Sequence, residues 1–138
     1  MVTLLVGKKG SGKTKKLIEN ANEAVKNSNG NVVVIEKGLK LTYDISHQAR
    51  LIDTEAYSIQ GVDALFGFIS GICAGNYDVT DMFVDSTLKI IGDDMNVLAA
   101  FIQKIDVLSK QAEVKVTLSV SADEKDIPES LGAIISKI

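Results

Sequence analysis

The feature that most constrains this chain is a glycine-rich segment near the N-terminus, Gly7-Lys8-Lys9-Gly10-Ser11-Gly12-Lys13-Thr14. It fits the pattern G-x-x-x-x-G-K-[ST] at every fixed position. The apolar run at residues 2–6 predicts a short buried strand before it. Apolar residues at helical spacing after it predict a helix that begins at about Lys13. A strand that turns through glycines into a helix favours an α/β fold.

This turn is suited to binding a polyphosphate. Glycines let the backbone adopt positive φ angles and approach an anion closely. The N–H groups of the turn and of the helix N-terminus then point at phosphate oxygens. The pattern places Lys13 at the β- and γ-phosphates and the Thr14 hydroxyl at Mg²⁺. We therefore expect residues 7–14 to bind a nucleotide, with Lys13 also catalytic; the alternative is a purely structural turn.

With its flanking strand and helix, the motif resembles the P-loop NTPase superfamily. The resemblance implies that an acidic residue at the end of a later strand holds Mg²⁺ through water, the Walker B position. Asp85 ends the apolar run at residues 82–85 and fits that position. In RecA-like and AAA-type members the next residue is usually a glutamate that activates the attacking water, whereas this chain has Ser86. Glu36, at the end of another predicted strand, is the internal candidate for the base, and a solvated strand-end acid explains it equally well.

Further positions favour the RecA-like and AAA-type branch over the GTPase branch. The guanine-reading pattern N-K-x-D is absent, and residues 121–124 read Ser-Ala-Asp-Glu instead, so we expect ATP as the nucleotide. Ser119 and Ser121 resemble the polar sensor at the end of the strand after Walker B. Arg50 is the only arginine, so the chain lacks the arginine clamp typical of nucleotide kinases. A surface cation is favoured over an arginine finger at this position.

Apolar patterning along the chain predicts alternating strands and helices. The predicted parallel strands are residues 2–6, 31–36, 82–85 and 114–120, and the predicted later helices are residues 62–74, 96–111 and a last one from Asp126. This pattern predicts a single domain with a three-layer α/β fold, in which helices cover both faces of a mainly parallel sheet. Because ligands bind at the carboxyl ends of such strands, residues 7–14 and Asp85 are expected to meet there.

Residues 39–54 follow a different pattern. Leu39, Leu41, Tyr43 and Ile45 alternate with polar residues, and a period of two predicts a strand. With a turn near residue 47 and a returning strand, we expect an antiparallel hairpin inserted into the fold. This hairpin is the candidate surface for a protein partner or for self-association.

Bulk properties exclude several classes of protein. The chain has 138 residues, of which 46% are hydrophobic, and contains no run of about 18 apolar residues, so we expect no membrane span. Residues 1–6 are too short for the apolar part of a signal peptide, so we expect a cytoplasmic location. A net charge of −3 argues against a broad nucleic-acid surface, which usually needs a basic stripe. Cys73 and His47 are the only residues of their types, and we expect neither to bind a metal.

Three functions remain open at this point. The first is an ATP-binding protein with slow or partner-stimulated ATPase activity, which uses Mg²⁺. The second is a small phosphotransferase, because a hairpin followed by a helix and an acidic strand end loosely resembles thymidine kinases. The third is an ATP-dependent switch that docks a partner without hydrolysis.

Overall fold

The structure is a computed structural model that describes residues 1–137, apart from the side chains of residues 133, 136 and 137. The strands are β1 (Val2–Gly7), β2 (Asn31–Glu36), β3 (Arg50–Asp53), β4 (Val79–Val84), β5 (Lys115–Ser121) and β6 (Ile135–Lys137). The α-helices are α1 (Lys13–Asn27), α2 (Val62–Gly75), α3 (Thr87–Ile91) and α4 (Met95–Ala112). Short 3₁₀ helices span Glu55–Tyr57, Glu124–Asp126 and Glu129–Ile134.

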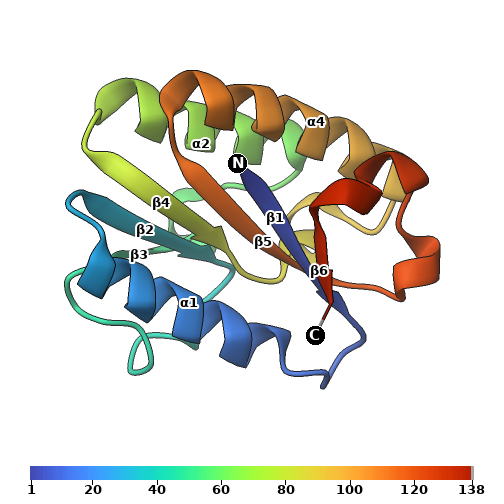
Figure 1. Ribbon diagram of the computed structural model, residues 1–138, viewed down its shortest axis with the longest axis horizontal. Coiled ribbons are helices and arrows are strands. Elements are labelled where there is room, and N and C mark those ends of the chain that lie inside the picture. The colour runs from blue at the N-terminus through green and yellow to red at the C-terminus, as the bar shows by residue number, and fades with distance from the viewer. Residues whose placement is uncertain (138) are drawn as a thin grey trace.

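Within residues 1–137 the strands form a six-stranded parallel sheet in the order β3-β2-β4-β5-β1-β6. Helices cover both of its faces, with α1 on one side and α2 and α4 on the other (Figure 1). The predicted α/β class with a parallel sheet flanked by helices is therefore confirmed. Since all the strands run the same way, their carboxyl ends lie along one edge of the sheet.

Two apolar cores lie on opposite faces of the sheet. In β1, Leu4 and Val6 pack into the core under α2 and α4, whereas Leu5 packs into the core under α1. In β2, Val33 and Ile35 belong to the first core, whereas Val32 and Val34 belong to the second. Burial on both faces is the reason why these strands are continuous apolar runs in the sequence.

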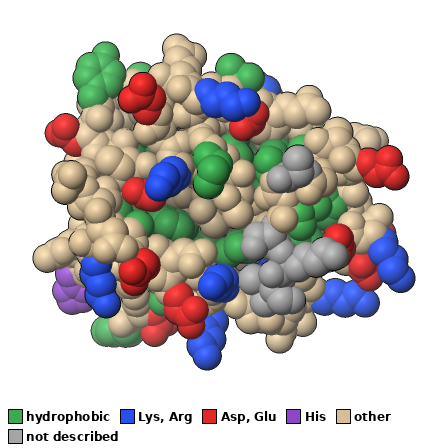
Figure 2. Space-filling model, viewed as in Figure 1, with side chains coloured by type: hydrophobic (Ala, Val, Ile, Leu, Met, Phe, Trp, Pro, Cys, Tyr) green, Lys and Arg blue, Asp and Glu red, His purple; other side chains and the backbone are tan. Residues whose placement is uncertain are grey.

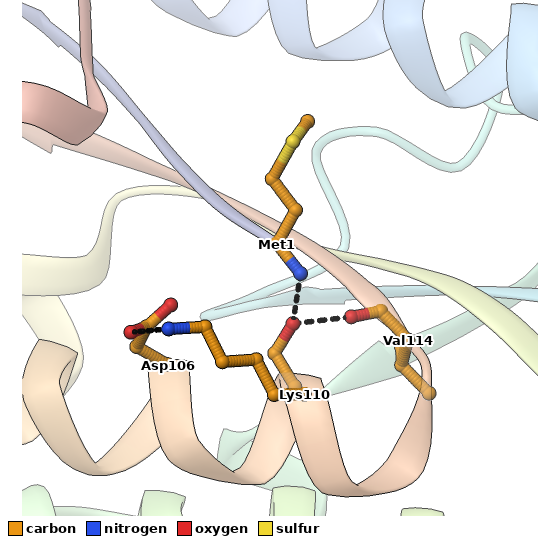
Figure 3. Close-up of polar contacts among 5 residues, drawn as sticks. Met1, Asp106, Lys110 and Val114 are labelled. Atoms are coloured by element: carbon orange, nitrogen blue, oxygen red, sulfur yellow. Dashed lines mark hydrogen bonds and ion pairs between the residues drawn. The ribbon is translucent and has the colours of Figure 1, made fainter.

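A buried polar contact ties the start of β1 to the end of α4 (Figure 3). The Ser109 hydroxyl, in the last turns of α4, donates to the Val114 carbonyl and accepts from the Met1 nitrogen. Beside it, Lys110 and Asp106 form an ion pair with 3.0 Å between nitrogen and oxygen. The Val116 N–H also donates to the Met1 carbonyl, at 3.0 Å. These bonds fix the position of β1 relative to both α4 and β5.

The antiparallel hairpin expected over residues 39–54 is wrong. Residues 37–49 form a loop of turns, and only Arg50–Asp53 is a strand, which pairs parallel to β2. Leu41 and Ile45 are buried, whereas Tyr43 between them is 96% exposed. The Ile45 N–H donates to the Leu41 carbonyl at 3.1 Å, so the buried pair is separated by one helical turn. The apparent period of two therefore arises because two buried residues four positions apart alternate with two exposed apolar residues, Leu39 and Tyr43.

The helix expected from Asp126 is also wrong. Two 3₁₀ helices occupy this region, and the chain then enters β6, which pairs parallel to β1. In this pairing Ile135 lies opposite Leu4. Of the apolar residues that resembled a helix face, Leu131 and Ile134 lie in the second 3₁₀ helix, Ile135 begins β6, and Ile138 lies outside the described residues. The strand β6 covers the otherwise open side of β1.

The surface carries charges of both signs. Figure 2 shows acidic and basic side chains interspersed over the face that it draws. None of the helices formed by residues 1–137 is long and apolar enough to cross a membrane.

The close approach of two chain segments at Gly30 gives a test of the fold. A Cβ added at Gly30 would lie 2.2 Å from the Asp78 carbonyl oxygen and 2.4 Å from Thr80 Cγ2. We predict that Gly30→Ala lowers the free energy of unfolding by about 1–3 kcal/mol, because the backbone must shift. Gly71→Ala is the control, since its Cβ meets nothing within 4 Å in α2. This control should raise stability by about 0.5–1 kcal/mol. Urea unfolding measures the free energy of unfolding of both variants. Equal changes in the two variants would contradict the close approach of the chain at Gly30.

Candidate functional site

The site lies at the edge of the sheet where the parallel strands end. The glycine-rich turn follows β1, Asp85 follows β4, and β5 lies between these two strands. The structure brings the turn and Asp85 into direct contact, because the Thr14 hydroxyl donates to the Asp85 carboxylate at 3.2 Å. These two residues are 71 positions apart in the chain.

Glycines are required in the turn by its local geometry. Gly12, at the N-cap of α1, has φ 95° and ψ 14°, which is the left-handed region. A Cβ at Gly7 would lie 2.3 Å from the Ser11 hydroxyl oxygen, so the Ser11 side chain would have to move to admit a larger residue. The turn is closed by the Ser11 N–H, which donates to the Lys8 carbonyl at 3.0 Å.

The Lys13 side chain folds back over this turn. Lys13 is only 6% exposed, and its Nζ donates to the Lys8 carbonyl at 3.0 Å. Burial lowers the pKa of Lys13 below its usual value, and the nearby negative charge of Asp85 opposes that shift. A phosphate oxygen placed in the turn could replace the Lys8 carbonyl as the acceptor of this ammonium group.

Asp85 is the centre of a hydrogen-bond network. Its carboxylate, in a residue that is 6% exposed, accepts from the Ser119 hydroxyl at 2.8 Å as well as from Thr14. The Ser86 hydroxyl donates to the same carboxylate at 3.2 Å. The Ser119 oxygen in turn accepts from the Ser86 N–H at 2.7 Å. Three hydroxyls from separate parts of the chain thus hold the carboxylate in one orientation.

The donor set fits Mg²⁺ bound together with phosphate. Mg²⁺ prefers oxygen ligands and is commonly held by one or two carboxylates, waters and substrate phosphates. The Thr14 hydroxyl and the Asp85 carboxylate are such oxygens and already lie in contact. Among residues 1–137, no group of three or more His, Cys, Asp and Glu residues gathers as a metal cluster. The chain would therefore supply few of the ligands itself.

Ser86 redirects the chain immediately after Asp85. It adopts φ 52° and ψ 52°, a left-handed conformation that is uncommon for residues other than glycine. It is the N-cap of α3, a five-residue helix that the sequence patterns did not predict. A helix of this length has too few residues to show a helical period.

A cavity of about 290 Å³ lies between the turn and α3. Its lining includes Lys9, Lys13, Thr14, Ser86 and Lys89. The volume is at the lower end of ordinary ligand pockets, about 300 Å³ and above. Three lysines around one cavity favour an anionic ligand. Lys89 was not singled out from the sequence, because it belongs to the unpredicted helix α3.

Lys8 and Ser121 lie near the cavity between the turn and α3. The Lys8 ammonium pairs with Asp123 at 3.4 Å, and the side chain of Lys8 is 77% exposed. Ser121 also lines the cavity, at the end of β5. The backbone N–H of Lys125 holds the pKa of Asp123 below its usual value, and Lys8 adds to this shift. The loop after β5 is thereby connected to the glycine-rich turn.

Glu36 lies at the same edge, at the end of the strand next to β4. Its two carboxylate oxygens accept the N–H groups of Lys40, at 3.2 Å, and Leu41, at 2.9 Å. Burial raises the pKa of Glu36 above its usual value, since the residue is 3% exposed. Its carboxylate thus holds the start of the loop at residues 37–49 and is not among the residues that line the cavity.

Arg50 is remote from the glycine-rich turn. It is exposed and begins β3, whereas the turn lies at the opposite, carboxyl-terminal edge of the sheet. In the register of β3 with β2, Arg50 lies opposite Val33, and Asp53 lies opposite Glu36 at the carboxyl end. This placement agrees with the simple surface cation that the sequence favoured.

No protein-family model matches the sequence, and no curated protein matches it significantly. The function has to be inferred from the geometry of the site.

The buried position of Glu36 predicts a pH dependence of stability. A glutamate whose pKa is raised in the folded state stabilises the fold fully below its unfolded value of about 4.5, and this contribution is lost as pH rises through the folded pKa. We therefore predict that the unfolding free energy of the wild type, minus that of Glu36→Gln, falls as pH rises above about 4.5. Urea unfolding at several pH values measures the difference. A difference that stays flat or rises with pH would contradict this assignment.

Proposed function

We propose that this protein binds Mg-ATP at residues 7–14 and Asp85 and acts as a slow or partner-stimulated ATPase. The observation that carries the proposal is the contact between the Thr14 hydroxyl and the Asp85 carboxylate, at 3.2 Å, beside the buried Lys13. This is the constellation implied by the resemblance to P-loop NTPases, in which these three residues serve the phosphates and the metal.

Each residue has a separate role in the proposed site. Backbone N–H groups of the turn would hold phosphate oxygens at the N-terminus of α1. Lys13 would exchange the Lys8 carbonyl for an oxygen between the β- and γ-phosphates. Thr14 and Asp85 would hold Mg²⁺, which neutralises charge on these phosphates when it is bound. Ser119 would keep Asp85 oriented, because it donates to that carboxylate at 2.8 Å.

We expect slow turnover because Ser86, the residue that follows Asp85, is not a base. Ser86 takes the place where related ATPases carry a glutamate, and a hydroxyl is a poor proton acceptor at neutral pH. Both oxygens of Glu36 are occupied by loop N–H groups. A positioned general base contributes about 10²–10⁴-fold to rate. Without one, basal hydrolysis would be slow unless a partner supplies the missing group.

The second candidate is an ATP-dependent switch that does not hydrolyse ATP. It is favoured by the Glu36 carboxylate, which accepts hydrogen bonds from the loop at residues 37–49. Glu36 connects the strand edge next to Asp85 with the loop at residues 37–49. That loop exposes Leu39 and Tyr43, at 64% and 96%, and remains the proposed surface for a protein partner. The phosphotransferase alternative loses the hairpin on which its likeness to thymidine kinases depended.

Calorimetric titration with Mg-ATP and Mg-GTP tests the central proposal. We predict that ATP binds more tightly than GTP and that Lys13→Ala weakens binding of ATP by about 10- to 100-fold, the value of one or two charge-assisted hydrogen bonds. Lys26→Ala, an exposed change at the far end of α1, is the charge-matched control and should bind ATP as the wild type does. If the folded wild type binds neither nucleotide, the proposal is wrong.

A second prediction tests whether a missing base limits turnover. We predict that Ser86→Glu raises the rate of phosphate release from Mg-ATP, since it supplies a carboxylate next to Asp85. Ser86→Gln is the matched control, because it has the same shape without a basic group. Release is measured under saturating nucleotide. Equal rates in both variants would show that a missing base does not limit turnover.

A further inference from the structure

A second cavity lies on the other side of α3, beyond the proposed nucleotide site. It has a volume of about 280 Å³, and its lining includes Lys37, Thr54, Ser58, Gln60 and Lys89. Lys37 directly follows β2, residues 54–60 follow β3, and Lys89 lies in the helix that follows β4. The cavity is therefore at the carboxyl-terminal edge of the parallel sheet, where ligands of such folds bind.

Lys89 connects the two cavities, since it lines both of them. It is exposed and lies in α3, which begins at the residue after Ser86. One flexible ammonium group can therefore reach ligands on either side of this helix. A ligand in the second cavity would lie next to the phosphates of a nucleotide in the first.

The chemistry of the second cavity favours an anion. Its lining contains two basic residues, Lys37 and Lys89, and a single acidic residue, Glu55. Among the ion pairs that residues 1–137 form, neither lysine has a carboxylate partner. The Lys37 ammonium makes only a long hydrogen bond, 3.5 Å, to the Lys89 carbonyl. Hydroxyl and amide groups of Ser58 and Gln60 add neutral donors around the same space.

We propose that this cavity binds a small oxyanion, a phosphate monoester or a carboxylate of a few carbon atoms. Two lysines and neutral donors are the groups that recognise such oxygens. The volume of about 280 Å³ has room for such an anion. The oxyanion site does not depend on the proposed function. Only the statement that the anion is a second ligand beside ATP rests on it.

The test is an NMR titration of amide signals with inorganic phosphate and, separately, with acetate. We expect one or both anions to shift the signals of residues 54–60. Lys37→Ala and Lys89→Ala should each weaken that response by about fivefold, as expected for an exposed ionic contact. Lys26→Ala is the charge-matched control and should respond as the wild type does. A response to phosphate alone identifies a phosphate monoester, and a response to acetate identifies a carboxylate.

Two results would overturn the oxyanion site. The first is the absence of any shift at residues 54–60 with either anion. The second is an unchanged response in both Lys37→Ala and Lys89→Ala. Mg-ATP titrations on the same samples report the nucleotide site separately, and there Lys89→Ala should also weaken binding. If phosphate shifts residues 54–60 while ATP fails to bind, the oxyanion site stands and the proposed ATPase function fails.

Discussion

The Asp85 carboxylate is the interaction on which the arrangement of the site depends. A carboxylate that is 6% exposed needs hydrogen-bond donors, because an unpaired buried charge is strongly unfavourable. Its donors are the hydroxyls of Thr14, Ser86 and Ser119, which come from α1, from the start of α3 and from β5. The sheet order makes this possible, since β5 lies between β1 and β4. One side chain thus links the ends of three neighbouring strands.

The sequence was informative where a local pattern has a fixed spacing. Gly12 and Thr14 are set by an eight-residue motif, and the central strands are set by apolar runs that are buried on both faces. The prediction for residues 37–49 was wrong because hydrogen bonds from elsewhere in the chain hold this loop. Asn22 in α1 accepts the Ser46 N–H at 2.8 Å and donates to the Asp44 carbonyl at 2.9 Å. No pattern within the loop reveals that a helix satisfies its backbone groups.

The same distinction applies within the site. Asp85 could be predicted because it ends an apolar strand, and the position of Ser119 at the next strand end was also readable. The hydrogen bond from the Ser86 N–H to the Ser119 oxygen could not be predicted from the sequence. It depends on the left-handed conformation of Ser86, which is uncommon for a residue other than glycine. Lys89 was missed for a related reason. Its place beside both cavities follows from a short helix whose direction is set by Ser86.

The fastening of β1 at Ser109 has a mechanical consequence for the opposite end of that strand. β1 spans six residues, or about 20 Å, between the Met1 contact and the glycine-rich turn. Sliding the strand along its axis would break the Ser109 bonds and its register with β5 together. We therefore expect β1 to keep its position if the turn adjusts to a ligand. The strand is held in place at its start, and the glycine-rich turn follows its other end.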